Sequence, residues 1–176
     1  MGDPHNPKRA GELWDQGRID YQLVELAKFK DLVVISGGWA WHFMSPPGHK
    51  EVKTQHDHKD IDVFVEPNNF GDLFIRFNEN GYERQRTIYD NPSGQFYRYT
   101  KFYDGGKVVF DVFLESLLPE QIIDVQGFKI LEPNFLLQQY GVKHSSDLCK
   151  AVVEARKLVA KGISPVGRSE LVYEAQ

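Results

Sequence analysis

The sequence has little of several features that would define a class of protein. It contains a single cysteine, Cys149, in 176 residues, which excludes an intramolecular disulfide and agrees with a reducing compartment. Its longest uninterrupted aliphatic run, residues 32–35, is far below the ~20 residues that a membrane-spanning helix needs. The N-terminal residues have neither the apolar stretch of a signal peptide nor the Arg-rich pattern of a transit peptide. We therefore expect a cytoplasmic protein with no membrane role.

An excess of charge of one sign is also absent. The 21 Lys and Arg against 25 Asp and Glu leave a net charge of −4, which gives no general attraction for nucleic-acid backbones. The 41% of hydrophobic residues is close to the globular average. We expect one domain over residues 1–176 with tails at 1–10 and 164–176, and no broad binding to nucleic acid.

Hydrophobic periodicity predicts an α+β protein: a mixed β-sheet flanked by helices, with a C-terminal helical pair. We expect an α/β core over residues 11–116 and a hairpin with helices over 117–163. The expected strands cover residues 32–35, 60–65, 82–88, 95–103, 107–114, 122–125 and 128–131. The expected helices cover residues 19–29, 39–43 and 67–81, with two more beginning at Pro133 and near Ser145. The apolar stripe of Phe70, Leu73, Phe74 and Phe77 is expected in the core.

Three aspartates lie on these apolar strands. Asp60 and Asp62 are two residues apart and therefore point to the same face, while Asp111 lies among the valines and phenylalanines of a later strand. Carboxylates that converge in an apolar setting repel one another unless a cation neutralises them. Mg²⁺ prefers such ligands and is usually completed by substrate phosphates, which indicates nucleotide chemistry. The alternative is that Asp62 and Asp111 form ion pairs with Lys or Arg.

A glycine turn separates the first strand from the helix that follows it. Ser36, Gly37 and Gly38 stand at this junction, where glycines let a polyphosphate approach backbone N–H groups. A Gly-Gly pair is also a common way to turn a chain, so this motif does not establish an anion site by itself.

Together, residues 33–40 (VVISGGWA), 58–63 (HKDIDV) and 109–113 (VFDVF) resemble the nucleotidyltransferase superfamily, also called the polymerase beta-like fold. The sequence is most similar to the small antibiotic nucleotidyltransferases that act on aminoglycosides and lincosamides. In that family a glycine turn opens a helix, an Asp-x-Asp strand follows about twenty residues later, and a third Asp lies on a later strand.

The resemblance implies a role for each matching position. Ser36 and Gly37 would contact the triphosphate, with Gly38 beside them as a further nucleotide-binding candidate, and Asp60 and Asp62 would bind two Mg²⁺ ions. Asp111 would bind the second ion and lie near the attacking hydroxyl. His58 and Lys59 are further candidates for holding phosphate, as is Lys143, although the family often carries its lysine closer to the Leu136-Leu137 segment.

Other motifs allow more than one interpretation. His49, His56 and His58 could form a zinc site, but a loop without cysteine favours a polar rim instead. The basic and aromatic stretch at 96–103 is typical of a half-buried strand more than of a base-stacking surface. Trp39 and Trp41 could pack in the core or cover a base.

The expected function is Mg²⁺-dependent transfer of a nucleoside monophosphate, AMP from ATP, to a hydroxyl of a small-molecule acceptor with release of pyrophosphate. One alternative is a catalytically silent relative that binds nucleotide or protein. Another is a nucleotidyltransferase that acts on protein or RNA. The chain is short, so a homodimer that completes the acceptor pocket is a further hypothesis.

Overall fold

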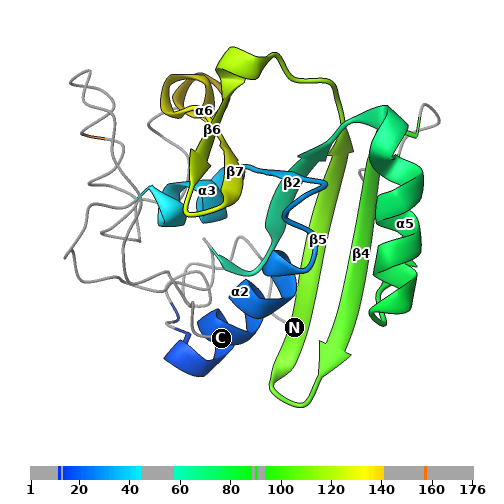
Figure 1. The fold of residues 1–176 in the computed structure, drawn as a ribbon. Coiled ribbons are helices and arrows are strands. Elements are labelled where there is room, and N and C mark those ends of the chain that lie inside the picture. Colours follow the sequence, from blue (N-terminus) through cyan, green and yellow to red (C-terminus); the bar gives the residue numbers. More distant parts are fainter. Residues whose placement is uncertain are drawn as a thin grey trace.

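The computed structural model describes residues 12, 14–44, 58–88, 90, 94–140 and 157 (Figure 1). Within these residues the strands are β1 (Val34–Ile35), β2 (Ile61–Val65), β3 (Glu83–Gln85), β4 (Phe96–Tyr103), β5 (Gly106–Leu114), β6 (Ile122–Val125) and β7 (Phe128–Leu131). The helices are α2 (Gln16–Ala27), α3 (Gly37–Phe43), α5 (Phe70–Glu79) and α6 (Pro133–Tyr140), with short 3₁₀ turns at Pro67–Asn69 and Pro119–Gln121.

The seven strands form one sheet in the order β3-β4-β5-β2-β1-β7-β6. Strand β2 is parallel to β5, and β1 is parallel to β7. The remaining neighbours are antiparallel. The expected mixed sheet of an α+β fold is therefore confirmed.

Two long strands, β4 and β5, form the largest hairpin of the sheet. Their turn at Asp104-Gly105 places Tyr103 opposite Gly106. Gly106 has a φ of 147°, which a residue with a side chain rarely adopts. The glycine-rich turn that the sequence predicts thus fixes the pairing of every residue along both strands.

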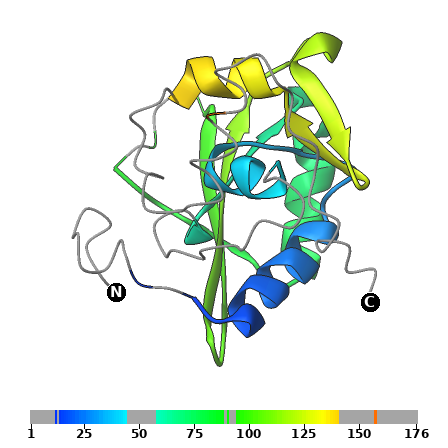
Figure 2. The same cartoon turned by 90° about the vertical axis from the view of Figure 1, so that its left-hand side faces the viewer.

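One face of the sheet is covered by α2 and α5, which lie on the same side of the β4–β5 hairpin (Figure 2). Aromatic rings fill this layer. The Phe110 ring on β5 lies 5.3 Å from Phe29 and 5.3 Å from Phe77 between ring centroids. Both partners are fully buried. This packing fixes the face of β5 that α2 and α5 cover, so polar residues of β5 can lie on its opposite face.

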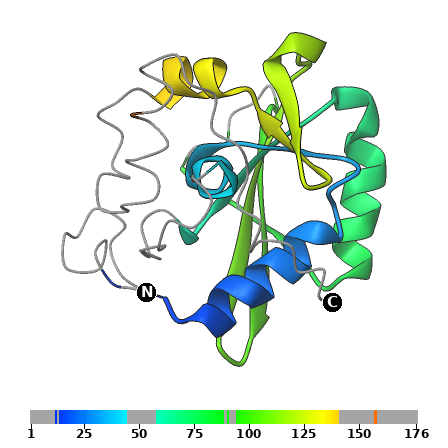
Figure 3. The same cartoon turned by 60° about the vertical axis from the view of Figure 1, so that its left-hand side comes forward.

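Helix α3 follows β1 directly and lies next to the β6–β7 hairpin (Figure 3). Its Phe43 ring packs on Phe128 at 4.7 Å between centroids. Trp39 and Trp41 are both buried, so they are core residues in this structure. Of the two interpretations that the sequence left open, the packing one is correct.

Several predicted boundaries shift. Helix α2 begins before Asp20, because Asp15 caps it by accepting the Arg18 backbone N–H at 2.8 Å. The predicted strand 82–88 is only three residues long, Glu83–Gln85. The predicted helix 67–81 divides into a 3₁₀ turn and α5.

One core prediction was wrong. Phe74 is 42% exposed, whereas Leu73 and Phe77 of the same helix are fully buried. Residues 73 and 77 are one turn apart and meet the sheet, and position 74 is rotated by about 100° from 73.

The second C-terminal helix of the prediction lies outside the described residues, apart from Lys157. None of the helices that the structure describes is long and apolar enough to cross a lipid bilayer.

Candidate functional site

Strand pairing brings Asp62 and Asp111 side by side. Strands β2 and β5 are parallel neighbours, and Asp62 is directly opposite Asp111. On the other side of β5, Arg98 of β4 is directly opposite Asp111. Residues that are opposite one another in a sheet share a face. The sheet therefore sets two carboxylates and a guanidinium in one row, on the face that α2 and α5 do not cover.

The Arg98 guanidinium holds Asp111 with two hydrogen bonds. Its Nε donates to Oδ1 at 2.6 Å, and its Nη2 donates to Oδ2 at 2.9 Å. The same Nη2 lies 3.8 Å from Oδ2 of Asp60. Lys59 forms a second ion pair with Asp60 at 2.6 Å. Asp60, Asp62 and Asp111, which we call the carboxylate cluster, thus lie beside two cationic side chains.

Burial and mutual repulsion of the negative charges raise the pKa of two carboxyl groups in the cluster. Burial raises the pKa of Asp62 well above its ordinary value, and the negative charges of Asp111 and Asp60 raise it further. Burial also raises the pKa of Asp111, although its hydrogen bonds from Arg98 oppose the change. Asp62 is the member whose ionised form most needs a further cation.

The glycine turn lies directly against Asp62. The Ser36 backbone N–H donates to the Asp62 carbonyl oxygen at 2.8 Å. Gly37 adopts a φ of 61°, and a Cβ on it would overlap Oδ2 of Asp62. The predicted turn and the predicted acidic strand therefore form one structural unit, in which only glycine fits at position 37.

Solved structures share this architecture at low sequence identity. The lincosamide antibiotic adenylyltransferase LnuA with lincomycin bound is 11% identical, with a TM-score of 0.50 over 83% of this chain and 98% of that chain. The antibiotic-resistance factor ANT(2'')-Ia in solution is 12% identical, with a TM-score of 0.47 over 84% of this chain and 83% of that one. The crystal structure of its complex with adenylyl-2''-tobramycin is also 12% identical, with a TM-score of 0.47 over 84% of this chain and 88% of that one. No family model and no curated protein sequence matches the chain.

The chain has the nucleotidyltransferase fold. The likeness to LnuA extends over nearly the whole of that protein, so the fold is shared as a unit and not as a fragment. At 11% identity it is the fold alone that the two proteins share.

In this nucleotidyltransferase fold, His58 does not lie in the exposed loop that its sequence context predicts. His58 is buried, not part of a polar rim. Its Nε2 lies 2.9 Å from Nδ1 of the buried His42, and Trp39 Nε1–H donates to the His58 carbonyl oxygen at 3.1 Å. His58 therefore links α3 to the segment that carries Asp60 and lies buried between them. His49, His56 and Lys143 lie outside the described residues.

The cluster fits Mg²⁺ through two of its members. Carboxylate oxygens are the donors that Mg²⁺ prefers, and a bound cation would offset the burial and the neighbouring negative charges that raise the pKa of Asp62. Within the described ranges, no group of three His, Cys, Asp or Glu side chains converges on one metal position. Asp111 already has both oxygens bound to Arg98, which leaves Asp60 and Asp62 to hold an ion.

Arg98 was not predicted as a site residue, although the hairpin turn determines which residue it pairs with. The Asp104-Gly105 turn pairs residue 103 with residue 106. Counting outward by five residues on each strand pairs Arg98 with Asp111. The stretch at 96–103 was correctly predicted as a half-buried strand. The pairing of Arg98 with Asp111 on the next strand was not predicted.

Two hollows continue the polar face beyond the carboxylates. One of about 330 Å³ is lined by Phe64, Phe113, Glu115 and Gln139. Phe64 follows Asp62 and Phe113 follows Asp111 by two residues, so both rings lie on the carboxylate face, 5.7 Å apart between centroids.

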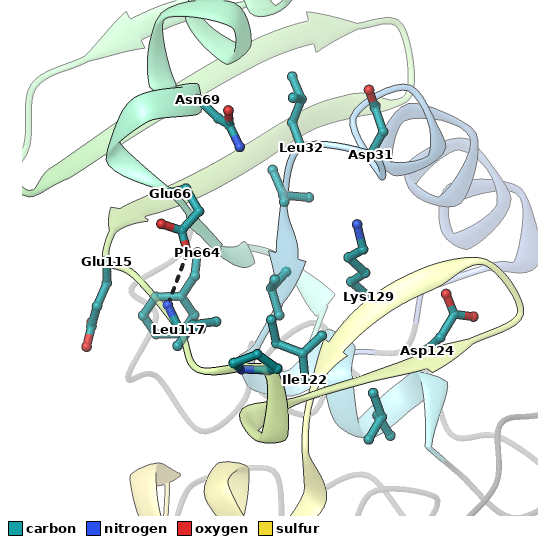
Figure 4. Close-up of a pocket in the computed structure, with 14 residues that line it drawn as sticks. Asp31, Leu32, Phe64, Glu66, Asn69, Glu115, Leu117, Ile122, Asp124 and Lys129 are labelled. Atoms are coloured by element: carbon teal, nitrogen blue, oxygen red, sulfur yellow. Dashed lines mark hydrogen bonds between the residues drawn. The ribbon is translucent and has the colours of Figure 1, made fainter.

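The larger hollow, of about 390 Å³, lies at the end of β2 that is remote from Asp60 (Figure 4). Its apolar floor includes Leu32 and Ile122. Glu66 lies on one side of it, and Lys129 lies on the other side with Asp31 and Asp124 near it. Glu66 is held in place by hydrogen bonds from Ser116 Oγ at 2.8 Å and from the Leu117 N–H at 3.2 Å. Both hollows share an apolar base with an acidic rim.

Proposed function

We propose that this protein is a Mg²⁺-dependent nucleotidyltransferase that transfers AMP from ATP to a hydroxyl of a small-molecule acceptor. The observation that carries the proposal is the Gly37 turn packed directly on Asp62, which lies in one cluster with Asp60 and Asp111. An acidic pair beside a strand-glycine-helix turn is the arrangement that a metal-triphosphate complex needs. The shared fold supports this proposal.

Each residue has a place in the proposed reaction. Asp60 and Asp62 would hold Mg²⁺, which when bound supplies positive charge for the triphosphate and the leaving pyrophosphate. The backbone of Ser36, Gly37 and Gly38 would receive phosphate oxygens, as the resemblance implies. Lys59, 2.6 Å from Asp60, is available to the phosphates when a metal ion takes over that carboxylate.

The transfer is a single in-line displacement. The acceptor oxygen forms a bond to the α-phosphorus of ATP while the bond from that phosphorus to the oxygen of the β-phosphate breaks. The electron pair of the broken bond leaves with pyrophosphate. The hydroxyl proton passes to a carboxylate of the cluster, so the products are an adenylylated acceptor and pyrophosphate.

The acceptor would lie over Phe64 and Phe113. Phe64 and Phe113 are the next residues on the same sheet face after Asp62 and Asp111, and they line the hollow. A molecule bound there would lie within reach of the α-phosphate. Glu115 at its rim would favour an acceptor with a basic group near an apolar part.

Binding and transfer can be tested separately. We expect ATP to raise the melting temperature only with Mg²⁺ present, and more than the other three nucleoside triphosphates do. Label from α-³²P-ATP should then move to an extractable metabolite and not to protein or RNA. Asp62→Asn should abolish both effects, whereas Asp72→Asn, in the first turn of α5 away from the cluster, should abolish neither.

One observation favours a second candidate, a nucleotide-binding protein that does not transfer. Asp111 has both oxygens bound to Arg98, and a carboxylate so held is a poorer base and metal ligand. A Mg²⁺-dependent rise in melting temperature with no labelled acceptor in a metabolite extract would support this candidate.

A further inference from the structure

We propose that Arg98 is the fixed cation of this site and takes the place of a second metal ion, so that the chain binds one divalent ion, on Asp60 and Asp62. The inference rests on the proposed function. It replaces the two ions that the family resemblance implies with one ion and one guanidinium.

The first support is the way in which Arg98 is attached. It donates to both oxygens of Asp111, from Nε at 2.6 Å and from Nη2 at 2.9 Å. This fork-to-fork pairing is the strongest geometry that an arginine and a carboxylate can form. It sets a positive charge against both oxygens with which Asp111 would otherwise hold a metal ion.

The second support is that Arg98 also reaches toward Asp60. Its Nη2 is 3.8 Å from Oδ2 of Asp60 while it remains hydrogen-bonded to Asp111. A metal ion held jointly by Asp60 and Asp111 would need the oxygens beside which this guanidinium lies. The positive charge of Arg98 would oppose the binding of a second cation there.

The third support is that the pair is built into the sheet. Arg98 and Asp111 are directly opposite residues of one antiparallel hairpin, so neither backbone can move without breaking the ladder. The Asp111 side chain is only 9% exposed and that of Arg98 is 26% exposed. Displacing Arg98 would leave a half-buried cation without its partner, which opposes exchange with a metal ion.

Charge balance agrees with a single ion. When Arg98 neutralises Asp111 and Lys59 turns from Asp60 to the phosphates, as proposed above, the carboxylates left in the cluster are those of Asp60 and Asp62, and one divalent ion neutralises both. Arg98 keeps Nη1, which Asp111 does not use, as a donor for a non-bridging oxygen of the α-phosphate. The guanidinium would then stabilise the charge that builds up there during the transfer.

Counting bound Mn²⁺ tests this assignment without measuring turnover. Electron paramagnetic resonance gives the Mn²⁺ bound per full-length chain in the presence of one equivalent of α,β-methylene-ATP. We expect one ion in the wild type and two in Arg98→Met, because that variant releases Asp111. Arg84→Met is the matched control, since Arg84 is opposite Tyr99 on the other sheet face; it should bind one.

Other counts overturn the proposal in distinguishable ways. Two ions in the wild type, or one ion in a folded Arg98→Met, contradict the role of Arg98 and leave the proposed function standing. No Mn²⁺ in any variant overturns the inference and the proposed function together. Should Arg98→Met fail to fold, Arg98→Lys decides: it keeps the charge but not the fork, so it should bind one ion and hold the analogue more weakly. Two ions in Arg98→Lys would again contradict us.

Discussion

The carboxylate of Asp62 lies where a side chain on Gly37 would be. Gly37 is at a φ of 61° at the start of α3, and an added Cβ would overlap Oδ2 of Asp62. The Ser36 N–H also donates to the Asp62 carbonyl at 2.8 Å. The turn that is proposed to receive phosphate and the acid that is proposed to hold Mg²⁺ therefore cannot move independently.

We predict that Gly37→Ala costs stability and abolishes nucleotide binding. A left-handed backbone conformation costs a residue with a side chain about 1–2 kcal/mol, and the added methyl group must also displace the carboxylate of Asp62. Urea unfolding and a Mg²⁺-ATP thermal-shift assay measure the two effects.

Gly71→Ala provides the matched control. Gly71 lies inside α5, and a Cβ there would meet nothing within 4 Å. Because alanine is the better helix former, this variant should gain up to about 1 kcal/mol and bind nucleotide as the wild type does. Equal behaviour of the two variants would contradict the packing of Gly37 on Asp62.

We predict that Asp62→Asn stabilises the metal-free protein at neutral pH. Burial and the neighbouring acids raise the folded-state pKa of Asp62, so the native state keeps a proton that the unfolded chain loses above its ordinary pKa of 3.8. Wild-type stability therefore falls as pH rises from that value to the folded-state pKa. Asparagine has no such dependence.

Urea unfolding in EDTA between pH 4 and pH 8 measures this difference. The advantage of Asp62→Asn should be small at the acidic end and reach its full size once the wild-type side chain is ionised. Saturating Mg²⁺ and ATP should reverse the order, since they bind the wild type alone. A stability difference that does not change with pH would exclude the strained carboxylate.

We predict that Tyr82→Phe destabilises the helical face of the sheet. Tyr82 donates to the buried Glu25 at 2.9 Å, and losing a hydrogen bond to a charged group costs about 1.5–3 kcal/mol. Burial alone would raise the pKa of Glu25, but hydrogen bonds from Lys28, Tyr82 and Lys101 outweigh burial and lower it. That contribution to stability is present above the ordinary pKa of 4.5 and is lost as pH falls through the folded-state value.

A double-mutant cycle with Glu25→Gln isolates this pair. The cost of Tyr82→Phe at pH 7 should shrink in the Glu25→Gln background, and it should also shrink in the wild type when Glu25 becomes protonated. An unchanged cost in both tests would attribute the effect to packing of the ring.

We predict that Trp39→Phe weakens nucleotide binding although Trp39 is buried behind the site. The substitution removes the hydrogen bond from Nε1 to the His58 carbonyl at 3.1 Å, with an expected cost of about 1–3 kcal/mol. That bond holds α3 to the segment leading into Asp60. Trp14→Phe, which trims a buried ring without this bond, should retain more of the affinity for Mg²⁺-ATP. Equal losses would argue against a positioning role.

Much of the sheet and the row of acids could be predicted from sequence because they depend on local rules. Alternation along a strand predicted that Asp62 points away from the apolar face, and the glycines at 105–106 predicted the β4–β5 hairpin. The predicted strand began one residue too early, because β2 starts at Ile61 and Asp60 lies just before it. The order of strands in the sheet could not be predicted in this way, because neighbours such as β2 and β5 are far apart in the chain.

The state of each charged group was harder to predict for a related reason. The position of His58 in a polar, lysine-rich stretch suggested solvent, but its burial depends on Trp39 and His42, which come from another element. Arg98 looked like one of several basic residues on a strand until its cross-strand partner was known. The burial of His58 and the ion pair of Arg98 both depend on contacts between residues that are distant in the sequence.

The β4–β5 turn has a consequence for how this protein can change. Because side chains alternate along a strand, adding or deleting one residue at Asp104-Gly105 would shift the ladder by one step and set Tyr97 or Tyr99 against Asp111 in place of Arg98. The charge of the carboxylate cluster would then be altered from a loop at the opposite end of the hairpin. Length variation in that loop is a remote route by which descendants of this chain could gain or lose a metal site without any substitution inside it.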